Sequence, residues 1–168
     1  MKKLMPSLIV TIFSFGGAIF YALSCIERSV LKLGLNHHSQ EVDEKDIRFV
    51  HASLKRLIPL LPPSNGVVIV FGTGAMVYQG FTRNWDRASI AVLAFYWSVM
   101  GYLISFGKIA AAVKDVRETN SDSSIEDGRR GVARLIVQHH IGLIANLGAV
   151  MLEFILMATD ARESPPTS

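Results

Sequence analysis

The sequence predicts an all-α protein whose four transmembrane helices form an antiparallel bundle, with an amphipathic cytoplasmic helix before the second span. Half of the 168 residues are hydrophobic, and charged residues make up only 18%, whereas soluble proteins carry roughly 25%. Four apolar runs are long enough to cross a bilayer as helices, which takes about 20 residues each. We therefore expect one transmembrane domain over residues 1–160, followed by a disordered tail over 161–168.

The first span is predicted over residues 4–26. Pro6 lies near its start, where a proline is tolerated because the first turn of a helix has no internal partner for its N–H groups. The helix is expected to continue beyond the membrane to about Leu35, and a polar connection over 36–46 follows.

An amphipathic helix is predicted next, over residues 47–61, because apolar side chains recur there at helical spacing. Its apolar face holds Ile47, Val50, Leu54, Leu57, Ile58 and Leu61, and His51 lies on or beside that face. Three prolines are expected to break or kink this helix before the second span over 65–82; they are Pro59, Pro62 and Pro63.

The second and third spans are expected to form a hairpin, because only the short segment TRNWDR connects them. The third span is predicted over 88–107, with a helical extension through KIAAAVKDVRE. A polar loop over 118–130 leads to the fourth span, which is predicted over 132–158.

The distribution of basic residues predicts the orientation. The first and third loops, with their helix extensions, hold most of the lysines and arginines, Arg28 and Lys108 among them. Because cytoplasmic segments are enriched in these residues, both loops are placed in the cytoplasm and both chain ends outside. Lys2 and Lys3 oppose this orientation. The expected location is a bacterial inner membrane.

Small and polar residues recur along one face of each span. In the fourth span they are His139, Gly142, Asn146, Ala149 and Glu153; in the first, Ser7, Thr11, Ser14, Ala18, Tyr21, Cys25 and Arg28; in the third and its extension, Ala91, Ala94, Ser98, Gly101, Ser105, Lys108 and Ala112. The pattern is weaker in the second span, where it consists of Asn65, Ile69, Gly72, Met76 and Gln79. Because small residues let helices approach closely in a membrane, we expect these faces to point into the bundle.

The cytoplasmic end offers candidates for ligand binding. Arg28, Lys108 and His139 are candidates for binding a ligand or an anion such as an anionic lipid headgroup. His51 and His139 are candidate ligands of haem or a transition metal. The alternative is that these side chains lie at the membrane interface and have only a structural role.

Glu153 is a candidate for proton coupling, because a carboxyl group inside an apolar span is costly unless it is protonated or paired. The structural alternative is a hydrogen bond or ion pair with the outer hairpin, where Gln79, Arg83 and Arg87 lie on the same side.

Several other classes of site are not supported. The single cysteine, Cys25, excludes an internal disulfide and a cysteine-based zinc site. Gly72-Thr73-Gly74 lies inside a span and is no phosphate-binding loop. No basic motif interleaved with aromatic residues suggests nucleic-acid binding. Lys2 and Lys3 before an apolar run resemble a signal peptide, but we expect an uncleaved first span.

The segments FGGAIFYALSCIERSVL and RLIPLLPPSNGVVIVFGTGAMVY, separated by a polar loop, resemble small four-helix bacterial integral membrane proteins of unknown function. Families with a similar layout include anthrone-oxygenase-like and copper-resistance-D-like proteins. The resemblance implies the four-helix layout along the chain. Haem-binding relatives have a histidine in the first span, which this sequence lacks, so haem binding is not implied.

Three functional hypotheses follow. The first is a non-enzymatic bundle or assembly subunit, whose partners are the lipid bilayer, anionic headgroups and either a second copy or a membrane complex. The second is a redox protein that binds haem or a metal through His51 and His139. The third is an oligomeric, proton-coupled transporter built around Glu153.

Overall fold

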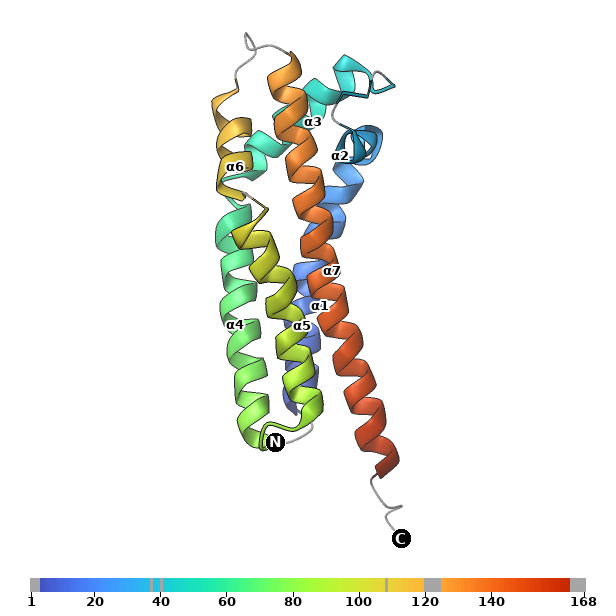
Figure 1. Cartoon of the computed structure of the whole chain (residues 1–168), viewed down its shortest axis with the longest axis vertical. Coiled ribbons are helices and arrows are strands. Elements are labelled where there is room, and N and C mark those ends of the chain that lie inside the picture. Colours follow the sequence, from blue (N-terminus) through green and yellow to red (C-terminus); the bar gives the residue numbers. More distant parts are fainter. Residues whose placement is uncertain (1–3, 37, 40, 108, 120–124, 164–168) are drawn as a thin grey trace.

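The computed structural model describes residues 4–36, 38–39, 41–107, 109–119 and 125–163, and every element in these ranges is helical, as predicted (Figure 1). The elements are α1 (Leu4–Ile26), the short 3-10 helix η1 (Arg28–Val30), α2 (Lys32–Leu35), α3 (Glu44–Leu57), α4 (Leu61–Thr82), α5 (Arg87–Ser105), α6 (Ile109–Glu118) and α7 (Ile125–Glu163).

Three helical segments are long and apolar enough to cross a membrane: Met5–Ile26, Arg87–Ser105 and Ile125–Arg162. A fourth candidate exists if α3 and α4, which are bent by 58° relative to each other, count as one broken span. The bend lies in the proline-rich segment where a break was expected. Pro62 and Pro63 start α4, where their missing N–H groups cost no hydrogen bond.

The 39-residue helix α7 runs along the whole molecule and is about 58 Å long at 1.5 Å per residue. Its N-terminal half lies beside α2, α3 and α6, and its C-terminal half lies beside α1 and α5 (Figure 1). Both of its ends exceed the predicted span. The first three residues of the predicted tail are helical, and 164–168 lie outside the described residues.

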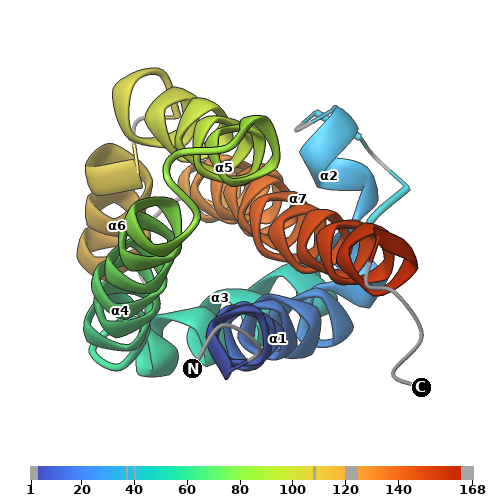
Figure 2. The ribbon, with the colours of Figure 1, turned by 90° about the horizontal axis from the view of Figure 1, so that it is seen from below.

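Seen along the long axis, α1, α4, α5 and α7 surround a common centre (Figure 2), and each packs along its two neighbours around that centre. Two groups of buried apolar side chains form the core. One lies around α3, α6 and the first half of α7 and includes Leu33, Ile47, Leu54 and Val116. The other lies between α1, α4, α5 and the second half of α7 and includes Phe13, Met76, Tyr96 and Ala149.

The buried face of α7 agrees with the sequence, since all five of its predicted inward residues are buried, from His139 to Glu153. The predicted inward faces of α1 and α5 were wrong. Ser7, Thr11, Ser14, Ala18, Tyr21, Cys25 and Arg28 are exposed, as are Ala91, Ala94, Ser98 and Ser105. Large side chains point inward instead.

Aromatic side chains packed against glycines explain this reversal. Phe13 lies against Gly72 of α4, and Phe20 lies against Gly142 of α7, so closely that a Cβ atom at either glycine would come within 2.5 Å of the ring. The glycines that allow close approach are therefore opposite the aromatic face of α1. Dense packing of this kind stabilises helix pairs in lipid, where the hydrophobic effect does not.

The hairpin between α4 and α5 is fixed by polar contacts. Asp86 caps α5 by accepting a hydrogen bond from Ser89 N at 2.8 Å. Arg83 donates to Asp86 at 2.7 Å and to both carboxylate oxygens of Asp160, at 2.5 and 3.0 Å. The hydrogen bond to Asp160 raises the pKa of the Arg83 guanidinium above its usual value. Arg83 therefore stays positively charged, and its ion pair with Asp160 connects the end of α7 to the hairpin.

Two glycines of α4 provide a matched test of this packing. Gly72→Ala is expected to reduce the stability of the protein by about 1–3 kcal/mol, because the new methyl group would displace the Phe13 ring. Gly74→Ala is expected to raise it by up to about 1 kcal/mol, because a Cβ atom there meets nothing within 4 Å and alanine favours the helix more than glycine does. Unfolding in one detergent measures both. Equal losses of stability would contradict the packing of Phe13 against Gly72.

Candidate functional site

A buried acid–imidazole contact joins the end of α1 to the middle of α7. Nδ1 of His139 lies 2.5 Å from Oε1 of Glu27. Glu27 is fully buried and His139 is 7% exposed. Glu27 directly follows α1, and its N–H still bonds to the carbonyl of Leu23, so the helical path carries its side chain to the same buried face. This contact is the most deeply buried polar interaction at this end of the molecule.

Of the two ligand or anion candidates that lie within the described residues, only His139 is at this position. Arg28, which was expected beside His139, is exposed, and the adjacent Glu27 occupies the inward position. Successive residues of a helix differ in direction by about 100°, so an error of one residue turns a side chain from the core to the surface. Lys108 lies outside the described residues.

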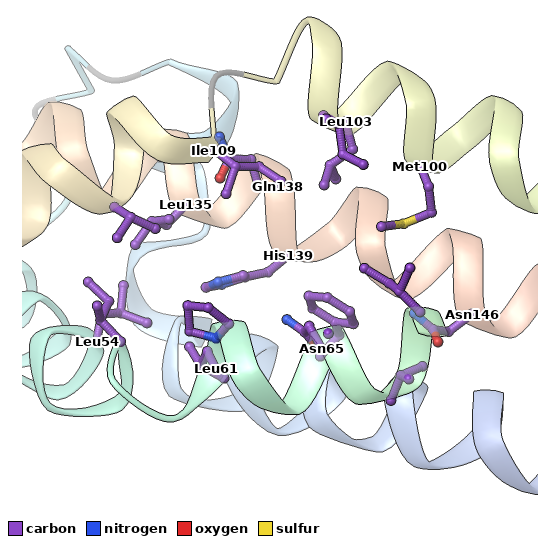
Figure 3. Close-up of a pocket in the computed structure, with 18 of the residues that line it drawn as sticks. Leu54, Leu61, Asn65, Met100, Leu103, Ile109, Leu135, Gln138, His139 and Asn146 are labelled. Atoms are coloured by element: carbon purple, nitrogen blue, oxygen red, sulfur yellow. The ribbon is translucent and has the colours of Figure 1, made fainter. Parts of the chain in front are cut away.

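A cavity of about 240 Å³ adjoins His139, between the two core groups (Figure 3). Its wall is mostly apolar and includes Phe20, Leu54, Leu61, Met100, Leu103 and Leu135. Its polar lining residues are Asn65, Tyr96, Gln138, His139 and Asn146. In the close-up the His139 side chain lies between Leu135 of α7 and Leu61 of α4. A mostly apolar cavity with a few converging polar groups is typical of a small-molecule site.

Some polar groups of this wall already have partners. The amide of Gln138 donates to the carbonyl of Gly107, in the break between α5 and α6. Asn146 Nδ2 donates to the carbonyl of Gly142 at 2.7 Å. The Oδ1 atoms of Asn65 and Asn146 are buried without a hydrogen bond, and that of Asn146 lies against Gly16 of α1. Among these lining residues, Asn65 therefore retains unused capacity for hydrogen bonding.

The imidazole of His139 also has a free edge. Its Nδ1 is engaged by Glu27, and no described residue bonds to its Nε2. Unlike Nε2 of His51, this atom is not among the buried polar atoms that lack a partner. Since His139 lines the cavity, its Nε2 is the atom that can reach a bound molecule.

His51 does not belong to this site. It is a half-buried residue of α3, it does not line the cavity, and nothing in the described part of the chain brings it into contact with His139. Within the described ranges, no group of three or more His, Cys, Asp and Glu side chains could hold a metal ion. The two histidines proposed for haem or a metal are thus not brought together.

Glu153 forms a separate contact near the other end of α7. It is fully buried and accepts hydrogen bonds from Gln79 Nε2 at 3.1 and 3.2 Å. Arg83 lies near enough to interact electrostatically with Glu153, as expected, but its hydrogen bonds go to Asp86 and Asp160. Glu153 lies roughly 21 Å along α7 from His139, too far for the two residues to share one site.

Glu27, which is the direct partner of His139, was not predicted from the sequence as a site residue. A signal was present, because Glu27 lies four residues after Leu23 and seven after Phe20 and therefore on the face that these large residues define. Whether Asn65 lines the cavity depends on where α4 begins. Whether Gln138 does so depends on the break between α5 and α6. Spacing within a single helix does not contain that information.

Comparison with protein-family models, curated proteins and solved structures finds no match to this chain. The layout shared with anthrone-oxygenase-like and copper-resistance-D-like proteins therefore stays a prediction from the sequence. The site rests on the geometry of its own residues.

A double-mutant cycle tests the contact between Glu27 and His139. His139→Phe alone is expected to cost about 3–5 kcal/mol of stability, because it leaves Glu27 buried without its partner. Glu27→Leu together with His139→Phe should recover most of that loss, since no unpaired charge remains. Unfolding of the wild-type protein, Glu27→Leu, His139→Phe and the double variant in the same detergent gives the coupling. Additive losses would argue against the contact.

Proposed function

We propose that this chain is an integral membrane protein of four spans whose cavity beside His139 binds a small, membrane-soluble molecule. The observation that carries the proposal is the cavity itself, which is apolar over most of its wall and has polar lining residues with unused hydrogen-bonding capacity at His139 and Asn65. The side chains that line an unfilled apolar cavity lack the dispersion contacts that they would make in a packed core. A ligand that filled the cavity would supply those contacts.

The lining residues on the outer surface indicate where such a molecule enters. Pro62 of α4 and Ile104 of α5 line the cavity and are also exposed, Ile104 to 56%. Both are apolar, and Leu60 and Phe106 beside them are exposed as well. An apolar rim favours entry from lipid over entry from water, because exposed apolar surface of this kind is suited to contact with acyl chains.

The four spans of this proposal are α1, α4, α5 and the apolar part of α7, in an antiparallel bundle with α3 as the amphipathic helix before the second span. Its support is that α1 begins, α4 meets α5, and α7 ends at one end of the molecule, while α2, α3 and α6 lie at the other. The bias of basic residues then places α2, α3 and α6 in the cytoplasm of a bacterial cell. Arg28, exposed at that end, would meet anionic headgroups.

Cysteine labelling tests the orientation. In a Cys25→Ser background, Arg87→Cys at the start of α5 should react with a membrane-impermeant maleimide on intact cells. Lys45→Cys, at the start of α3, should react only after the inner membrane is permeabilised. Both positions are exposed, so access to the reagent depends on the side of the membrane. The reverse pattern would invert the proposed orientation.

A pair of glycine variants in α4 tests the cavity as a binding site. Pentylbenzene at about 100 times its dissociation constant should stabilise the wild-type protein by roughly 2.7 kcal/mol. Gly66→Phe should abolish this effect, because Gly66 lines the cavity and a Cβ atom there meets nothing within 4 Å. The measurement is thermal unfolding in one detergent with and without the probe.

Gly74→Phe is the matched control for this experiment. Gly74 lies on the same helix and has equally open space around it, but it does not line the cavity. The control should therefore keep the stabilisation by pentylbenzene. If the probe does not stabilise the wild-type protein, or if it stabilises Gly66→Phe equally, the cavity is not a binding site.

A further inference from the structure

Two groups of helices meet at the level of the cavity beside His139. Helices α2, α3 and α6, which we call the cap, lie beside the first half of α7, whereas α1, α4 and α5 lie toward the other end of the molecule (Figure 1). Within the described residues, α3 and α6 pack along α7 and against each other, but neither packs side by side with α4 or α5. These two cap helices are therefore joined to α4 and α5 mainly through α7 and the chain connections.

The cavity occupies the place where direct packing between these helices is missing. Leu54 of α3 and Val113 of α6 line it from the cap. Pro62 of α4 and Leu103 of α5 line it from the opposite side. Side chains that face an unfilled space lack partner atoms across it, and so lose the dispersion contacts of a packed core. The turns of α3 and α6 beside the cavity therefore lack packing on the side that faces α4 and α5.

Two polar contacts of the cap connect its helices to each other and to α7. Lys55 of α3 donates a hydrogen bond at 3.1 Å to the carbonyl of Thr119, just beyond α6. Arg134 of α7 forms an ion pair with Asp115 of α6. Neither contact reaches α4 or α5. A molecule that fills the cavity is therefore in a position to touch both sets of helices at once.

We propose that this chain is a ligand sensor, in which a molecule bound in the cavity holds α3 and α6 against α4 and α5. This inference rests on the proposed function, because it assigns a consequence to ligand binding in that cavity. A ligand that contacts both sets of helices binds more tightly when both are in place, and such a difference in affinity shifts a conformational equilibrium. The turns of α3 and α6 beside the cavity thus open locally without the ligand and close around it. In the proposed orientation, binding from the membrane changes the order of helices that face the cytoplasm.

Hydrogen exchange of backbone amides tests this inference on the wild-type protein in one detergent. Pentylbenzene is the probe, at about 100 times its dissociation constant. The amides of residues 54–58 and 113–118 should exchange up to about 100-fold more slowly with the probe than without it, because every opening that releases the probe is opposed by that factor. The hairpin over residues 83–86 is the internal reference. Its amides lie at the opposite end of the molecule, so their local openings do not release the probe and their exchange rates should not change.

A variant that fills the cavity provides a second measurement. Gly66→Phe places an aromatic side chain in the cavity, since Gly66 lines it and a Cβ atom there meets nothing within 4 Å. Without any probe, this variant should show slower exchange in α3 and α6 than Gly74→Phe, its matched control outside the cavity. Adding pentylbenzene should slow exchange further in the control and should have no effect on Gly66→Phe. The comparison of the wild-type protein with and without the probe stands even if a variant does not fold.

The outcomes also distinguish this inference from the proposed function. If pentylbenzene stabilises the wild-type protein but leaves exchange in α3 and α6 unchanged, the cavity is a binding site and the sensor is rejected alone. Equal slowing in α3, α6 and the hairpin reference would also reject the sensor, because it would show a uniform gain in stability. If pentylbenzene does not stabilise the wild-type protein, the proposed function fails and this inference fails with it.

Discussion

Polar side chains that are buried among apolar ones must find partners, and α7 supplies the partner at three levels of the molecule. His139 meets Glu27 at the end of α1, Glu153 meets Gln79 of α4, and Asp160 meets Arg83 in the hairpin. Lipid provides no hydrophobic drive for helix association, so close packing and interhelical hydrogen bonds must hold the helices together. The two buried pairs, Glu27–His139 and Gln79–Glu153, also fix the register of the helices that they join, because sliding either helix by one turn would separate the partners. The length of α7 is what allows one helix to make all three contacts.

The same requirement explains which helix faces could be predicted from the sequence. The inward face of α7 was identified correctly because imidazole, amide and carboxyl groups at His139, Asn146 and Glu153 must avoid lipid. The face of α1 was misassigned because its hydroxyl groups have no such need. Thr11 donates to the carbonyl of Ser7 at 2.8 Å, and so satisfies its hydroxyl within its own helix. A small-residue face can then point outward, while the aromatic face of α1 packs against glycines of other helices.

The site could be predicted only in part, for a related reason. His139 was found because it stands out in an apolar run, and the helical class and the break at the prolines also followed from local sequence. Glu27 and the cavity were missed because both depend on how separate helices meet. The inward position at the end of α1 depends on a rotation that is set by Phe13 and Phe20 against their glycines. The volume of the cavity depends on where neighbouring helices stop, which no single-helix periodicity encodes.

The cavity has a structural cause in two interruptions that border the same space. α4 begins at Leu61 after the 58° bend from α3, and α5 ends at Ser105 before α6 begins at Ile109; residues on both sides of each break line the cavity. α7 continues unbroken past this level, so the outer helices change direction while the helix they pack against does not. Side chains of a straight helix cannot follow both directions, and the mismatch leaves unfilled volume. The carbonyl of Gly107, released by the second break, is satisfied by Gln138. This hydrogen bond satisfies the polar group that the break exposes, but it does not fill the cavity. A ligand that filled the cavity would stabilise the fold by restoring the missing packing contacts.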